Sequence, residues 1–177
     1  MATFTESEIH RHWHVWQMYR DGPVALVHRE SLLDQIIVEL KDAGYIVHIC
    51  NTESSDEISF EKTLRSVLGF PANQLGQTNL NAFNDSLSDL EFPNCTGIVV
   101  VVKHVQKLHE NDPIYLHMIM DIFAEQSRYH LCFGHRLMLV LQSDDRDIRL
   151  QPVGGRRPVW NSREPRYKHE SDADDTG

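Results

Sequence analysis

GIVVVV, residues 97–102, is the stretch of sequence that decides the fold, because it is an apolar run rich in β-branched residues with no polar interruption. A strand with one solvated face alternates polar and apolar residues, whereas an unbroken run of this length indicates a strand buried on both faces. Two further runs share this character, YIVHIC (45–50) and RLMLVL (136–141). Strands buried on both faces are typical of parallel sheets covered by helices.

Helical patterns lie around these runs. Apolar residues at helical spacing predict a helix over residues 32–40 that ends before Gly44. A second helix is predicted over residues 60–68, with Ser59 as its cap and Gly69 after its end.

Two more helices are predicted from their caps. Asn79 is the expected N-cap of one, and Asp112, followed by a proline at the first helical position, caps the other. Strands that alternate with helices predict an α/β fold in which a small parallel β-sheet of three strands is flanked by helices. Residues 24–27 are a candidate fourth, N-terminal strand.

The chain divides into three predicted parts. Residues 1–22 form an N-terminal helical extension, with a single amphipathic helix over residues 6–19. Residues 23–147 form the α/β domain, and residues 148–177 form a polar tail, rich in glycine and proline and expected to be disordered. The apolar face of the N-terminal helix is expected to comprise Ile9, Trp13, Trp16 and Tyr19.

Cysteine usage and hydropathy indicate a cytoplasmic protein. Cys50, Cys95 and Cys132 are odd in number and widely spaced, so we expect reduced, packed side chains. The N-terminal residues lack a basic segment followed by an apolar one, so no signal peptide is expected. The apolar runs are too short to span a membrane.

No recognisable catalytic constellation is present. The sequence has no GxSxG, no phosphate-binding glycine loop and no HExxH. His10, His12 and His14 would share a face on a strand, but Ile9 and Trp13 favour a helix, which would scatter them. We therefore predict no enzymatic activity, no metal site and no cofactor.

Charge points to a basic partner. The formal net charge is -9, and no lysine or arginine occurs between Arg65 and Lys103, a segment that contains Asp85, Asp89 and Glu91. The negative field of such a segment argues against direct binding of nucleic acid and favours a basic protein.

The stretch NLNAFNDSL, residues 79–87, has two interpretations. Wound as a helix, it places leucine and phenylalanine on one stripe and a polar stripe opposite. Most amphipathic helices simply keep such a stripe solvated, but the absence of basic residues around it favours a binding face. The polar stripe consists of Asn81, Asn84, Asp85 and Ser88.

The sequence around this stretch resembles that of the barstar family of intracellular ribonuclease inhibitors. The resemblance rests on Gly69-Phe70-Pro71 after a helix, on Gly76, on Asn79-Leu80-Asn81-Ala82-Phe83, and on Asp85 followed by Leu87. It continues in order through GIVVVV and LMLVL and covers residues 45–142. It implies a parallel sheet of three strands flanked by helices, and inhibition of a nuclease by covering its active site.

The resemblance also implies a site. The acidic residue at the position of Asp85 enters the phosphate-binding pocket of the enzyme in that family, Glu125 matches a second acidic contact, and residues 73–78 match the contact loop. The partner-binding residues expected on this basis are Asn73, Gln74, Gly76, Asn79, Asn81, Asn84, Asp85, Ser88, Asp89 and Glu125. The implied function is an immunity-type inhibitor of a ribonuclease or nuclease toxin, and the alternative is an interaction module with a non-nuclease partner.

The sequence departs from the family pattern at contact positions. The founding member has an aspartate where this chain has Asn81, a tryptophan where it has Asn84, and tyrosines in the loop where it has Asn73, Gln74 and Leu75. Aromatic anchors supply much of the affinity of an interface. These differences predict a divergent member with a different target, or with no nuclease target at all.

Overall fold

The computed structural model describes residues 4–52, 56–72 and 77–165, and a five-stranded sheet forms its centre. All neighbouring strands are parallel, in the order β2-β3-β4-β1-β5. The strands are β1 (Val24–Val27), β2 (Tyr45–Asn51), β3 (Gly97–Lys103), β4 (Leu137–Gln142) and β5 (Val159–Trp160). The three predicted strands and the candidate fourth are confirmed, and β5 is an addition that the sequence did not indicate.

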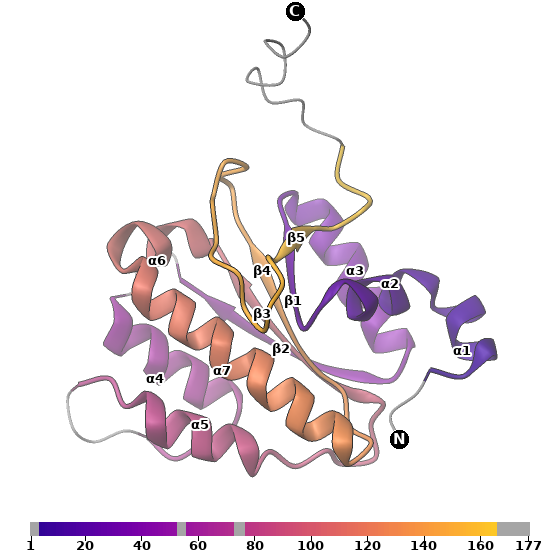
Figure 1. Cartoon of the computed structure of the whole chain (residues 1–177), viewed down its shortest axis with the longest axis horizontal. Coiled ribbons are helices and arrows are strands. Elements are labelled where there is room, and N and C mark those ends of the chain that lie inside the picture. Colours follow the sequence, from indigo (N-terminus) through magenta and orange to yellow (C-terminus); the bar gives the residue numbers. More distant parts are fainter. Residues whose placement is uncertain (1–3, 53–55, 73–76, 166–177) are drawn as a thin grey trace, which may run out of the picture.

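Helices cover both faces of this sheet, as apolar strands require. Helices α4 to α7 pack on one face, and α2 and α3 pack on the other (Figure 1). The helices are α1 (Glu6–Arg11), α2 (Trp13–Asp21), α3 (Glu30–Asp42), α4 (Glu57–Val67), α5 (Leu80–Ser88), α6 (Val105–Asn111) and α7 (Pro113–Cys132). In the described part of the chain, none of them has the length and hydropathy needed to cross a bilayer.

The centre of the core lies on β3 and β4, where only Lys103 at the end of β3 is not fully buried. On the face covered by α4 to α7, Phe60, Phe83 and Phe123 are fully buried and come from three different helices. Burial of each such ring stabilises the fold by roughly 1.5–3 kcal/mol. This aromatic layer therefore fixes α4, α5 and α7 relative to the sheet.

The helix ends agree with the predicted caps, with one exception. Asn79 caps α5 and Asp112 caps α7, each accepting a hydrogen bond from the main-chain N–H three residues later. The prediction that Ser59 caps the second helix is wrong, because α4 begins one turn earlier. Asp56 is its N-cap and accepts from the N–H of Ser59 (2.8 Å).

The N-terminal segment forms two short helices and not the single helix that the sequence predicted. His12, with φ -125° and ψ 48°, interrupts the helix between α1 and α2. The predicted apolar face is wrong at Trp13, which is 45% exposed. The residues that α2 buries against the α3 side of the sheet are Val15 and Met18.

The segment after residue 147 differs most from the sequence-based interpretation. Ile148, Leu150 and Val153 are buried in the same core cluster as α4 to α7, and β5 pairs with β1. The prediction of a disordered tail is therefore wrong for residues 148–165. The remaining residues of the predicted tail, 166–177, lie outside the described residues.

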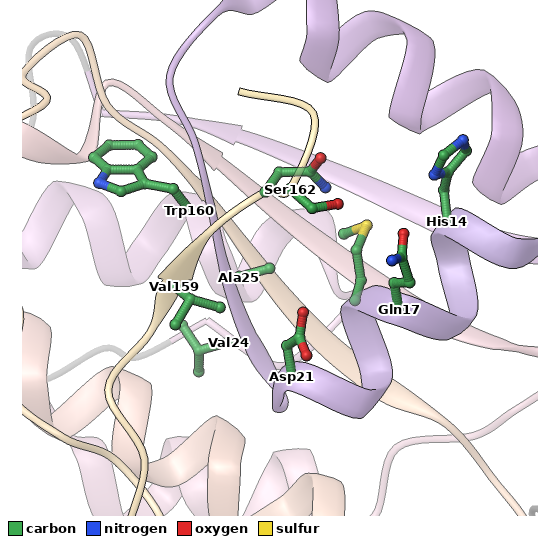
Figure 2. A pocket seen from close by; sticks show the side chains of 10 residues that line it. His14, Gln17, Asp21, Val24, Ala25, Val159, Trp160 and Ser162 are labelled. Carbon is green, nitrogen blue, oxygen red and sulfur yellow. The ribbon is translucent and has the colours of Figure 1, made fainter. Parts of the chain in front are cut away.

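The C-terminal segment also packs close to α2. Figure 2 shows Val159 and Trp160 beside β1, with Gln17 and Asp21 of α2 near the same strand. The recess between them holds only about 10 Å³. This is enough for about one water molecule, so the recess is a packing contact and not a ligand cavity.

The three cysteines are free thiols, as predicted. Burial raises the pKa of the Cys50 thiol to about 12, so this side chain stays protonated at neutral pH. Cys132, at the end of α7, is exposed. The prediction of a packed side chain is therefore wrong for that residue.

Candidate functional site

Helix α5 presents a row of polar side chains to solvent. Phe83 and Leu87 are fully buried beneath it. Asn81 and Asp85, one helical turn apart, are both exposed on the opposite side of the helix. The structure therefore places a carboxylate and an amide side by side, on a helix whose other face is fixed in the core.

The start of α5 is held by a buried ion pair from α4. Glu61 and Arg65 are one turn apart, their side chains are only 2% and 4% exposed, and Arg65 Nε donates to Glu61 Oε1 at 2.8 Å. The second carboxylate oxygen of Glu61 accepts from the main-chain N–H of Asn79 (2.8 Å), and Arg65 Nη2 donates to the carbonyl oxygen of Asn79 (3.0 Å). Both main-chain groups of the N-cap are thus fixed from the neighbouring helix.

Helix α7 holds the other side of α5. Gln126 Nε2 donates to the side-chain oxygen of Asn84 (2.8 Å), and Nε2 of His130 donates to the carbonyl oxygen of Leu87 (2.8 Å). Burial lowers the pKa of the His130 imidazole, and the bond to Leu87 opposes this effect only in part. His130 is therefore a neutral donor at neutral pH. With both ends held, α5 carries Asp85 on a rigid support.

The other predicted contact residues have different roles. Ser88 donates its hydroxyl hydrogen to the carbonyl oxygen of Asp85 (2.8 Å) and so completes the end of the helix. Asp89 is exposed at the C-cap of α5. Glu125 is exposed on α7 and precedes Gln126, which contacts α5.

Asn79, the N-cap, and Asn84, the partner of Gln126, are structural in their described contacts, as is the hydroxyl of Ser88. Asn73, Gln74 and Gly76, predicted for the contact loop, lie outside the described residues. The structure thus brings Asn81, Asp85, Ser88 and Asp89 together on α5 and its C-cap, and Glu125 lies on the helix packed against it.

A groove of about 540 Å³ lies beside α5. Its walls are the end of α4 with the residues that follow it, the end of α5 with its own following loop, and the first half of β2. Most of the lining is apolar, and Asp89 and Glu91 supply its carboxylates. The lining residues are Ile46, His48, Leu68, Gly69, Phe70, Pro71, Ser86, Asp89, Leu90, Glu91, Pro93 and Ile98.

The surface around α5 is acidic. Arg65 is the last basic residue before Lys103. It is buried in an ion pair with Glu61, so it does not neutralise the acidic surface around α5. The guanidinium of Arg128 on α7 lies against Gly154 of the C-terminal segment. The exposed carboxylates on α5, its following loop and α7 include Asp85, Asp89, Glu91, Asp121 and Glu125. The predicted negative field is therefore located on one side of the domain.

One group of potential metal ligands occurs among the described residues, at the carboxyl ends of the strands. It consists of Glu30, His104 and Asp144. The carboxylate of Asp144 already accepts from His104 Nδ1 (2.8 Å), Gln106 Nε2 (2.9 Å) and Gln142 Nε2 (2.8 Å). This arrangement is a hydrogen-bond network that joins β4 to the start of α6, and it leaves few oxygen lone pairs for an ion.

A family model described as barstar (barnase inhibitor) matches residues 44–142. The chain belongs to the barstar family. Members of this family are inhibitors and not enzymes. The matched residues contain β2, α4, α5, β3, α6, α7 and β4.

The barstar family match does not include β1 and α3. These elements lie before residue 44, and β1 nevertheless pairs with β4, the last strand inside the match. On the other side, β5 pairs with β1. The sheet of this member is therefore wider than the matched part of the chain by two strands.

Solved structures align with the chain at low sequence identity. The structure of Drosophila ORC bound to DNA aligns with a TM-score of 0.50 and 12% identity, covering 79% of this chain and 37% of that one. A Walker-type ATPase of Pyrococcus abyssi aligns with a TM-score of 0.37 and 12% identity, covering 86% of this chain and 52% of that one. The chain thus spans well under two thirds of each structure. No curated protein matches the chain.

The sequence did not reveal how α5 is held in this barstar-family member. Glu61 and Arg65 are an acid and a base four residues apart, a common spacing on exposed helices. The available signal was that both positions fall beside the apolar residues of α4, Phe60 and Leu64. Charged residues that flank a buried stripe at helical spacing are candidates for a buried pair.

Proposed function

We propose that this barstar-family protein inhibits a ribonuclease or nuclease toxin by covering its basic active site with α5. The observation that carries the proposal is the exposed Asp85 on a helix fixed at its N-cap by Glu61 and Arg65 and along its side by α7. A rigid carboxylate loses little conformational entropy when it binds.

The chemistry of nuclease sites favours such a group. A nuclease must hold phosphate, so its site carries arginine, lysine or histidine, and a fixed carboxylate can occupy the place of a phosphate oxygen. The absence of an exposed lysine or arginine on α5 and its following loop supports a basic partner.

The target is proposed to differ from that of the family's founding member. Asn84, at the position of an aromatic anchor, bonds Gln126 and is half-buried, so it offers a partner little apolar area. Asn81 is exposed but neutral. Specificity then depends on hydrogen bonds of Asn81 and on the acidic flank at Asp89, with Asp85 as the central charge.

The test is inhibition of nuclease activity by the purified chain. Barnase and, separately, the small basic protein encoded nearest to this gene serve as probes. We expect Asp85→Ala to weaken inhibition of the true target by about 30-fold or more, which corresponds to about 2 kcal/mol. Asp34→Ala, which removes an exposed carboxylate on α3, is the matched control and should change inhibition by less than about twofold.

Salt dependence provides a second readout. Association driven by opposite charges slows as ionic strength rises, so the on-rate of the wild type should fall between low and physiological salt. If a target binds Asp85→Ala as tightly as the wild type, the proposed mechanism is wrong. Tight, salt-insensitive binding of a protein without nuclease activity would instead favour the alternative, a barstar-like module with a non-nuclease partner.

A further inference from the structure

Strand β2 lies at the edge of the sheet and lacks the usual protection of an edge. It pairs with β3 on one side and is the first strand in the order. Its seven residues, YIVHICN, include no lysine, no other charged residue and no proline. Natural proteins shorten edge strands or place charges, prolines or bulges on them, because an open edge pairs with other chains. An edge without these features is a potential docking site.

The hydrogen bonds between β2 and β3 show which main-chain groups of β2 point away from the sheet. Thr52 N–H donates to the carbonyl of Lys103, and the carbonyl of Gly44 accepts from Thr96, so even-numbered residues of this segment face β3. Alternate residues of a strand point their main-chain groups in opposite directions. Val47 and Ile49 therefore direct N–H and C=O outward, and no described residue bonds these groups.

The two sides of this edge differ in character. On the side of α4 and α5, Ile46 and His48 line the 540 Å³ groove, whose only carboxylates are those of Asp89 and Glu91 and which has no lysine or arginine in its lining. On the side of α3, Ile49 is 45% exposed, an unusual value for isoleucine on a strand. An added strand would therefore meet an acidic, partly apolar groove on one side and an apolar surface on the other.

We infer that the edge of β2 binds an extended segment of a partner protein as a sixth strand, with basic and apolar side chains in alternation. Because side chains of a strand alternate between faces, every second residue would enter the groove near Asp89 and Glu91, where a lysine or arginine is complementary. The residues between them would cover Ile49. The inference does not rest on the inhibition of a nuclease: the two surfaces share Asp89, but the added strand requires the edge of β2 and not Asp85.

A second copy of this chain fits the edge less well. The strand it would offer, β2, has no basic residue to meet Asp89 and Glu91. The net charge of -9 on each copy also opposes self-association at low salt. Charge complementarity therefore selects a basic segment from another protein.

The experiment uses the full chain and a labelled ten-residue peptide of alternating valine and lysine, capped at both ends. Fluorescence anisotropy measures binding. Two matched peptides accompany it, one with glutamate for lysine and one with an N-methyl group at every residue, which has no main-chain N–H on either edge to pair with a strand. We expect the lysine peptide to bind at least about tenfold more tightly than either, since both charge and main-chain pairing are required.

Substitutions in the groove separate specific docking from general attraction. Asp89→Lys combined with Glu91→Lys should weaken binding of the lysine peptide by about tenfold or more, while Asp34→Lys, on α3 and outside the groove lining, should weaken it by less than about twofold. Hydrogen exchange detected by NMR should slow at the amides of Val47 and Ile49 when the peptide is bound.

Three outcomes would overturn the inference. Equal binding of the lysine and N-methylated peptides would show that no strand is added. An equal effect of Asp34→Lys and the groove double variant would show non-specific attraction. A dimer of the free chain in sedimentation equilibrium, with Val47 and Ile49 amides already protected, would show that a second copy occupies the edge. Asp85→Ala should leave peptide binding unchanged, so failure here and failure of the proposed inhibition are distinguishable.

Discussion

The buried carboxylate of Glu61 links α4 to the start of α5. Arg65 and the main-chain N–H of Asn79 help to offset the cost of its desolvation. The guanidinium of Arg65 also lies over the ring of Phe83, at 5.6 Å from its centroid. One ion pair thus joins α4, the N-cap of α5 and the aromatic core.

We expect Glu61→Gln to lower the free energy of unfolding by about 3 kcal/mol, because it leaves the buried charge of Arg65 without its partner. Urea denaturation measures the effect, and Glu110→Gln, at an exposed position on α6, is the control with little expected change. A result within about 0.5 kcal/mol of the wild type would contradict the importance of the pair.

A double variant separates stability from positioning. Glu61→Leu with Arg65→Met removes both charges, so stability should recover in part relative to Glu61→Gln. The amide of Asn79 should nevertheless exchange faster than in the wild type, because no carboxylate remains to accept its hydrogen bond. Wild-type exchange at Asn79 would show that Glu61 does not position α5.

Sequence patterns correctly predicted the roles of residues whose hydrogen-bond partners are close to them in the chain. Asn79 and Asp112 were correct as caps because a cap acts on an N–H three residues away. Glu61 was missed because the amide it binds lies 18 residues later in the chain, and Asn84 appeared to belong to the free polar stripe because Gln126 is 42 residues later. Pattern analysis indicates which face is polar, but not which polar groups already have partners.

At the scale of elements, a buried carboxylate adds to the strand pairing and apolar contacts that attach the C-terminal segment. Glu164, only 4% exposed, accepts from the main-chain N–H groups of His28 (2.9 Å) and Arg29 (3.0 Å) and from the guanidinium groups of Arg29 (3.0 Å) and Arg146 (3.1 Å). Burial raises the pKa of the Glu164 carboxyl, but the bonds from Arg29 and His28 outweigh it and hold the pKa below its ordinary value.

This shift predicts a pH dependence. Because the folded pKa lies below the unfolded value of 4.5, the ionised carboxylate stabilises the fold above that pH, and the contribution is lost as the pH falls through the folded pKa. Glu164→Gln should lower the free energy of unfolding by about 2 kcal/mol at pH 7. The difference between variant and wild type should shrink on acidification below about pH 4.5.

Urea denaturation at a series of pH values measures this difference. Glu110→Gln is again the control, since its carboxylate is exposed. Limited trypsin digestion provides an independent readout, because the bonds after Arg156 and Arg163 should become more accessible when the segment is released. A difference that stays constant from pH 7 to pH 3 would contradict the role assigned to Glu164.

Sequence patterns predicted the strands with long apolar runs, but they did not predict the ordered structure of the C-terminal segment. The runs at β2, β3 and β4 are long and apolar, so their strands were evident. The C-terminal segment packs through Ile148, Leu150 and Val153 and through a strand of two residues, which produce no period. Its place in the fold depends on Glu164 meeting His28 and Arg29, a contact between distant parts of the chain.

At the scale of the molecule, the C-terminal segment completes the core. We expect removal of residues 148–177 to lower the free energy of unfolding by about 4 kcal/mol or more, because three buried apolar side chains lose their contacts and the core beneath them is exposed. Removal of residues 166–177 alone is the control. Calorimetry of both truncated chains measures the effect, and equal melting temperatures would show that residues 148–165 contribute nothing to the core.

The pairing of β1 with β4 has a consequence for the order of folding. The register joins Val24 to Leu139, and β5 then joins β1 through Ala25 and Val159. During synthesis, β1 leaves the ribosome early but has no partner strand until more than a hundred further residues have followed. Contacts of such long separation form slowly. We therefore expect the three strands inside the family match to assemble first, and the pairing of β1 with β4, followed by that of β5 with β1, to come late in the folding of a newly made molecule.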